Sequence, residues 1–142
     1  MSDSSFTSLI IQEYSKSQYY CGKIDGADVQ WHQGNSVCGD DITIYLQVQD
    51  QHVLTYRFDG NTSLITHASA SFLGDLIVWA SIMDVLHWTE QTMLDHDFVV
   101  STRRRRASVI AILSCRNGLH CYLQDGLQDD FDDILDWYPD LI

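Results

Sequence analysis

Hydrophobic and polar residues alternate along three stretches in the first half of the chain, the pattern of half-buried β-strands. The predicted strands cover residues 27–33, 41–49 and 53–59, and the middle one has the clearest alternation. Its expected buried face consists of Ile42, Ile44, Leu46 and Val48. Because short polar turns join these strands, the pattern predicts an antiparallel meander with one covered face.

Apolar residues at intervals of three or four predict helices in the rest of the chain. In chain order, these helices cover residues 4–15, 65–83, a broken pair within 84–100, 107–115 and an acidic C-terminal helix over about 125–142. Gly118 is expected just past the helix at 107–115, because glycine suits the residue after a helix and costs stability inside one. The fold class is therefore α+β, a three-stranded antiparallel sheet with helices packed on one face.

Composition narrows the class of protein. With 142 residues, 45% of them hydrophobic and 20% charged, the chain is expected to form a single globular domain over residues 1–142. Its formal net charge of −12 argues against nucleic-acid binding, since phosphates would be repelled. No run is apolar enough to span a membrane and the polar start is no secretory signal, so we expect a cytoplasmic protein without a membrane partner.

Positive charge is concentrated in one block. Four of the eight basic residues stand together at Arg103, Arg104, Arg105 and Arg106. Paired hydrogen bonds from such a block suit an acidic surface on a protein partner. The block also suits the aspartate-rich C-terminal segment of this chain, so the sequence leaves both uses open.

The candidate chemistry lies in the loop before the middle strand, where Cys38, Gly39 and Asp40 follow one another. A cysteine is a soft metal ligand or a sulfur carrier, and a nearby carboxylate can ligate beside it or tune its reactivity. The same residues also suit a surface turn with a free thiol and a capping aspartate. The motif alone therefore does not assign a function.

With this order of elements, the chain resembles the iron–sulfur cluster assembly scaffolds, namely the IscU and SufU proteins and the N-terminal domain of NifU. The resemblance covers about residues 10–123, and its motifs are Asn35-Ser36-Val37-Cys38-Gly39-Asp40, Arg57-Phe58 and Ala68-Ser69-Ala70-Ser71. It implies a SufE/NifU-like fold. It also implies a protein partner such as a cysteine desulfurase or another assembly protein.

In that family, three cysteines and an aspartate hold a nascent iron–sulfur cluster or a zinc ion. The first cysteine and the aspartate match Cys38 and Asp40, but the other two cysteine positions are Ser63 and Ala107. A neutral hydroxyl is a poor ligand for iron in a cluster, and alanine supplies none. His67, one helical turn after Ser63, is a further candidate ligand that equally suits a packing role. The implied cluster or zinc therefore lacks two of the family's ligands here.

Two functions follow from the resemblance. In the first, the chain is a scaffold or a sulfur or iron carrier, with Cys38 and Asp40 as the remaining site and the missing ligands supplied by a partner or a second subunit. In the alternative, it is a degenerate, metal-free binding module that docks to assembly proteins or other partners through Arg103–Arg106. We expect no enzyme, because no Ser–His–Asp signature, phosphate-binding glycine loop or H-E-x-x-H motif is present.

Overall fold

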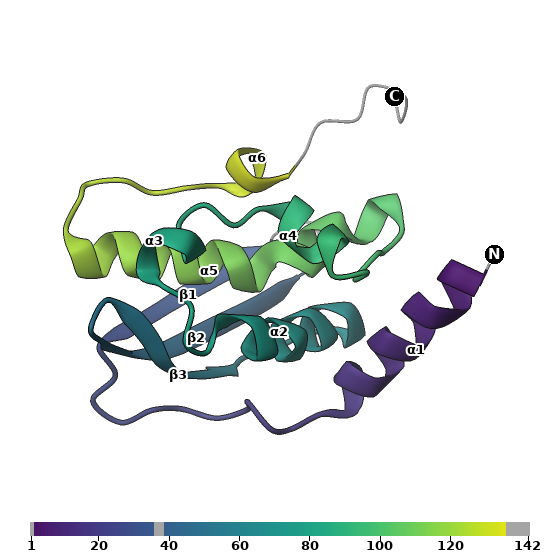
Figure 1. Ribbon diagram of the computed structural model, residues 1–142, viewed down its shortest axis with the longest axis horizontal. Coiled ribbons are helices and arrows are strands. Elements are labelled where there is room, and N and C mark those ends of the chain that lie inside the picture. Colours follow the sequence, from purple (N-terminus) through teal and green to yellow (C-terminus); the bar gives the residue numbers. More distant parts are fainter. Residues whose placement is uncertain (1, 36–38, 136–142) are drawn as a thin grey trace.

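A computed structural model describes residues 2–35 and 39–135 of the chain (Figure 1). The elements are α1 (Ser2–Lys16), β1 (Val29–Asn35), β2 (Asp40–Gln49), β3 (His52–Asp59), α2 (Leu64–Ile77), α3 (Ile82–Val85), α4 (Glu90–Asp95), the 3₁₀ helix η1 (Thr102–Arg104), α5 (Arg105–Leu123) and α6 (Phe131–Ile134). The predicted α+β class is confirmed. Among the described residues, no helix is both long and apolar enough to cross a bilayer.

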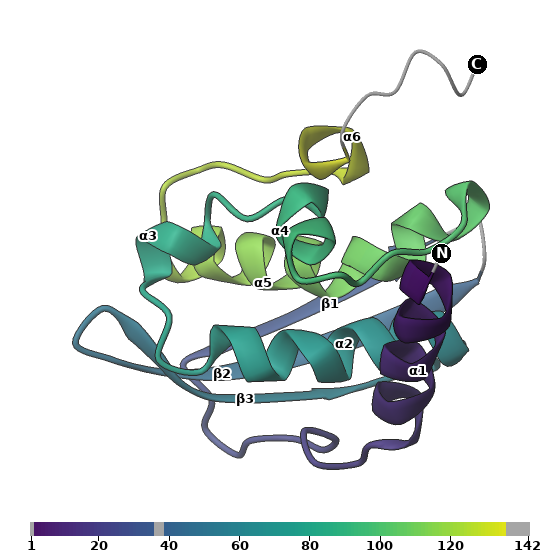
Figure 2. The ribbon, with the colours of Figure 1, turned by 45° about the vertical axis from the view of Figure 1, so that its right-hand side comes forward.

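The three strands form one antiparallel sheet in the order β1-β2-β3, with Val29 opposite Leu46 and Asn35 opposite Asp40. α2 and α5 lie side by side on one face of this sheet, with α5 over β1 and β2 (Figures 1 and 2). The predicted meander with helices on one face is thus confirmed. α1 packs against α2 at the edge of this layer.

The core forms between the alternating residues of β2 and the two long helices. Ile42, Ile44 and Leu46 are fully buried, as their spacing predicts. Val48 is only half-buried, and it lies where the pairing between β2 and β3 shifts register. The buried Tyr56 side chain of β3 donates a hydrogen bond of 2.8 Å to the carbonyl of Ala70, which ties the sheet to α2.

The helix predicted over residues 65–83 is too long, because α2 ends at Ile77. Trp79 has a φ of 75°, in the left-handed region, which no α-helix tolerates in its interior. Its backbone N–H donates to the carbonyl of Val53 at 2.7 Å, and Ser81 forms a bridge with His52. The chain therefore leaves the helix to bond to β3, a long-range interaction that the apolar spacing does not reveal.

The prediction that Gly118 follows a helix end is wrong, because α5 continues through it to Leu123. A Cβ atom at this position would lie 2.6 Å from Cγ1 of Val29 and 3.2 Å from Cβ of Trp31. Glycine here lets the helix approach β1 closely, and the burial gained outweighs its low helix propensity. The helix instead ends at Gln124, whose φ is 55°.

The acidic C-terminal helix is also shorter than the 125–142 expected. Residues 124–130 carry no regular structure and pass along α5, and α6 has four residues (Figure 1). Two of these, Phe131 and Ile134, are buried in the core. Residues 136–142 lie outside the part of the chain that the structure describes.

Candidate functional site

Asp40 is the first residue of β2 and is almost completely buried, with 6% of its surface exposed. Its Oδ1 accepts a hydrogen bond from the backbone N–H of Ser63 at 2.9 Å. Its Oδ2 accepts hydrogen bonds from the hydroxyls of Ser63 at 2.8 Å and Thr66 at 2.5 Å. The carboxylate therefore ties the beginning of β2 to the first turn of α2.

This arrangement makes Asp40 a cap for a helix to which it does not belong. The first amides of a helix lack partners within the helix, and the positive end of its dipole favours a negative charge. Ser63, the residue before α2, makes no side-chain cap of its own and instead donates its hydroxyl to Asp40. Any metal bound through Asp40 would compete with these three hydrogen bonds.

Ala107 lies in the first turn of α5, next to α2. The hydroxyl of Ser69 on α2 donates to the carbonyl of Ala107 at 2.8 Å, so the two helices are joined near their N-terminal ends. Both helices begin at the same end of the molecule, where β1 ends and β2 begins (Figure 2). The structure thus brings Asp40 and Ser63 into contact and places Ala107 on the neighbouring helix. Cys38 lies outside the described residues.

His67 makes contacts typical of a packing residue. Its Nε2 lies 2.7 Å from the carbonyl oxygen of Ser17, and its ring meets that of Phe58 edge-on at 5.3 Å between centroids. The Ser17 carbonyl thereby favours a proton on Nε2, which removes the lone pair that a metal would need there.

The four arginines of the predicted block have different surroundings. Arg105 forms a bidentate ion pair with Glu90 of α4, with Nε 2.8 Å from Oε2 and Nη2 2.5 Å from Oε1. The guanidinium of Arg106 lies 4.9 Å from the ring centre of Phe131, a cation–π contact. Arg103 and Arg104 are exposed in η1. Two of the four arginines are thus engaged within the fold.

Comparison with known proteins identifies the fold and the family. The sequence matches the family model described as the NifU-like N terminal domain over residues 6–128. This chain belongs to that family. A curated relative, the iron–sulfur cluster assembly scaffold protein IscU of Thermotoga maritima, is 35% identical over 81 residues. That match spans 57% of this chain and 57% of the relative's length.

Two solved structures share the fold of this NifU-like domain. One is a candidate iron–sulfur cluster assembly scaffold protein for the SUF system from Fervidobacterium islandicum AW-1, with a TM-score of 0.69 and 20% identity over 78% of this chain and 93% of that one. The other is the N-terminal part of a NifU-like protein from Brucella abortus, with a TM-score of 0.68 and 13% identity over 83% of this chain and 94% of that one. At these identities, the likeness shows the fold alone.

The described residues of this NifU-like domain do not make up a cluster or zinc site on their own. Among them, no three His, Cys, Asp or Glu side chains are grouped as metal ligands. The mapped positions among the described residues offer one carboxylate engaged with α2, one hydroxyl and one methyl group, whereas both zinc and iron–sulfur clusters need several thiolates or imidazoles. Burial raises the pKa of the Cys21 and Cys115 thiols, which keeps them protonated.

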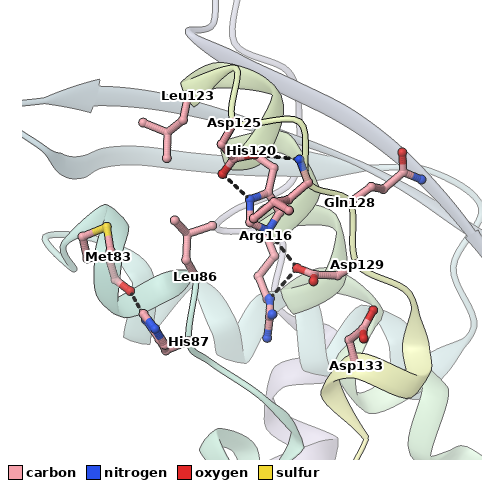
Figure 3. A pocket seen from close by; sticks show the side chains of 11 residues that line it. Met83, Leu86, His87, Arg116, His120, Leu123, Asp125, Gln128, Asp129 and Asp133 are labelled. Carbon is pink, nitrogen blue, oxygen red and sulfur yellow. Dashed lines mark hydrogen bonds and ion pairs between the residues drawn. The ribbon is translucent and has the colours of Figure 1, made fainter.

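A second polar cluster lies at the C-terminal end of α5, and the sequence analysis did not predict it. Asp129 accepts from Arg116 Nε at 2.9 Å, and its Oδ2 lies 3.0 Å from His120 Nε2 (Figure 3). The Nδ1 atom of His120 lies 2.7 Å from Asp125 Oδ2. The sequence signal for this cluster is the spacing of Arg116 and His120. They are one helical turn apart, which places both side chains on one face of a helix.

Proposed function

We propose that this chain acts in iron–sulfur cluster assembly as a scaffold or sulfur carrier that needs a partner to complete its ligand set. The observation that carries this proposal is the family match over residues 6–128, which contains the sequence Cys38-Gly39-Asp40. The name of the Thermotoga relative supports the same role. Family and relatives together favour it over a metal-free docking module.

The described residues on either side of the loop fix where it leaves and rejoins the sheet. The loop leaves β1 at Asn35 and returns to β2 at Asp40, and these two residues are partners across the strands. The backbone N–H of Gly39 donates to the carbonyl of Asn35 at 2.8 Å, and its φ of 74° suits glycine. In this proposal, Asp40 acts as a positioning residue that fixes the return point of the loop against α2.

Sulfur reaches Cys38 by thiol–persulfide exchange with a cysteine desulfurase. The Cys38 thiolate attacks the outer sulfur of the donor persulfide, a new S–S bond forms on Cys38, and the donor cysteine leaves as a thiolate. The exchange moves one sulfur atom and consumes no oxidant or reductant. Because a common cluster needs about four ligands, the cluster itself is cargo held jointly with a partner or a second subunit.

Arg103 and Arg104 are the arginines of the block that we assign to partner docking. They precede α5 and are exposed, which suits contact with an acidic partner surface. Replacing both by glutamate should slow sulfur transfer from a desulfurase without lowering the melting temperature. The matched control is Lys16→Glu with Lys23→Glu, which makes the same charge change at two other exposed cations.

The test of the main proposal is persulfide transfer. The reduced protein is incubated with a cysteine desulfurase and L-cysteine, and intact mass spectrometry detects the added sulfur atom. We expect one added sulfur in the unmodified chain and in Cys121→Ala, whose thiol is exposed in the native protein. Cys38→Ala should gain none. Loss of the added sulfur in Cys121→Ala, or no transfer at all, would overturn the proposal.

A further inference from the structure

A groove lies at the C-terminal end of α5, which is the end farther from Asp40. It is formed by α3, the last turns of α5 and the segment 125–133 (Figure 3). This distal groove has a volume of about 480 Å³. The residues that line it include Met83, Leu86, Arg116, His120, Leu127 and Asp133. Ala107 and His120 are separated by roughly 20 Å along α5, at about 1.5 Å per residue, so the groove is remote from the Asp40 end.

Large apolar side chains are exposed along this groove. Met83 of α3 is 61% exposed and Leu127 is 63% exposed, and Leu123 is exposed beside them. Single exposed apolar residues are common, but several along one groove are typical of a ligand-binding or protein-interaction surface. Methionine suits such a surface because its unbranched side chain adapts to different partners.

The side chains of Arg116 and His120 in the groove are already paired with carboxylates. Arg116 is bound to Asp129, and both ring nitrogens of His120 lie within hydrogen-bond distance of carboxylates, Asp129 on one side and Asp125 on the other. The groove therefore offers little positive charge to an anionic ligand. The backbone N–H of Leu127 and the His120 ring lower the pKa of Asp125, so this carboxylate is ionised at neutral pH.

The segment that carries Leu127 is held in place by the fold. Asn117 donates to the carbonyl of Asp129 at 3.0 Å and accepts from the backbone N–H of the same residue at 2.7 Å. Phe131 and Ile134 are buried just beyond. Because this side of the groove is already ordered, a partner does not bear the entropic cost of ordering it.

We propose that the distal groove docks a basic segment of a partner protein, with an apolar side chain inserted beside Met83 and Leu127 and flanking lysines or arginines near Asp125 and Asp133. The acidic lining and the chain's net charge of −12 favour a basic partner by charge complementarity. This surface is separate from the Cys38 loop, and the inference does not depend on the proposed assembly role.

A peptide-binding experiment tests this inference. The probe is a fluorescein-labelled amphipathic peptide of leucine and lysine, compared by anisotropy with a lysine-only peptide of equal length and charge. We expect the leucine–lysine peptide to bind more tightly, and Leu127→Asp to weaken its binding about tenfold. The matched control is Leu9→Asp, since Leu9 is 62% exposed on α1 and the substitution is identical. If charge attraction alone caused the binding, Leu127→Asp would strengthen it, because the added aspartate attracts a cationic peptide.

Methyl NMR provides a second measurement that also reports on folding. The methyl signal of Met83 should shift as the peptide is added, while that of Met93, which is buried, should stay in place in each folded variant. If Leu127→Asp does not fold, Met83→Asp takes its place. Equal affinity for the two peptides, or equal weakening by Leu9→Asp, would refute the inference. A native dimer that Leu127→Asp dissociates would also refute it, because a second copy would then occupy the groove.

Discussion

Two carboxylates at opposite ends of the helix layer join separate parts of the chain, Asp40 beside the start of α2 and Asp129 beside the end of α5, but their donors differ. At the N-terminal end, Asp40 accepts from the neutral amide of Ser63 and from the hydroxyls of Ser63 and Thr66. At the C-terminal end, Asp129 accepts from a guanidinium and lies beside an imidazole. Removing Asp40 leaves neutral groups unpaired, whereas removing Asp129 leaves a partly buried cation unpaired, which costs more.

The two ends also differ in the roles that we propose for them, an assembly site near Asp40 and a docking groove near Asp129. The resemblance places the family's cluster site at the Asp40 end, where the described polar groups satisfy one another, and our proposal assigns the chemistry to Cys38 and a partner. At the other end, Asp129 joins the segment 125–133 to α5 through Arg116 and His120. The groove beside it has exposed apolar side chains. Polar groups thus hold the fold together at both ends, and those around Asp129 also lie beside the groove that we propose as a docking surface.

The largest expected effect comes from restoring the family's thiols at the Asp40 end. Ser63→Cys with Ala107→Cys should raise zinc affinity by more than about 100-fold, since even disturbing a partner of a ligand commonly costs 10–100-fold. Competition with a chromophoric zinc chelator measures the affinity. The gain should disappear when Cys38→Ala is added. A gain that survives this addition would show that Cys38 does not belong to the restored site.

The next largest effect is expected for Asp129→Ala, which should lower the free energy of unfolding by about 3 kcal/mol. The reason is that Arg116 and His120 lose their shared carboxylate in a mostly buried position. Urea denaturation provides the measurement. Asp132→Ala is the control, because Asp132 is exposed and its loss should change stability by less than about 0.5 kcal/mol.

A smaller loss, about 2 kcal/mol, is expected for Asp40→Ala, which removes the cap of α2 and leaves three donors unpaired. Asp40→Asn should cost less than about 1 kcal/mol, because its carbonyl still caps and the two hydroxyls can rotate to accept. Urea denaturation of the metal-free chain separates capping from metal binding. If both variants were as stable as the native protein, Asp40 would not act as a cap.

The smallest effect concerns pH. Since the pKa of Asp125 is lower in the folded chain than its usual 3.8, its contribution to stability is present above pH 3.8 and is lost as pH falls below it. The stability difference between the native chain and Asp125→Asn should therefore shrink as the pH falls from about 4 to about 3. Thermal melts of both proteins across this range measure the difference. A difference that grew as the pH fell below about 4 would contradict the lowered pKa of Asp125.

The sheet and the family could be predicted from the sequence because both depend on local patterns. Alternation along residues 41–49 identified the buried face of β2. The order of elements, with the motif ending in Cys38-Gly39-Asp40 and the motifs at residues 57–58 and 68–71, indicated the family later matched over residues 6–128. Helix ends were less predictable. Trp79 and Gly118 were misjudged because their conformations depend on contacts with β3 and β1, which are distant in sequence.

What the sequence by itself determined was the order of elements and the buried face of the sheet. These follow from residue type and spacing, which act locally. Only the tertiary structure decided that Asp40 caps α2 and that Arg105 pairs with Glu90 of α4. It also decided that Asp129 joins Arg116 to His120 beside an exposed groove. The physical reason is that a carboxylate carries no local signal of its partner, and only the folded chain brings the donors within hydrogen-bond distance.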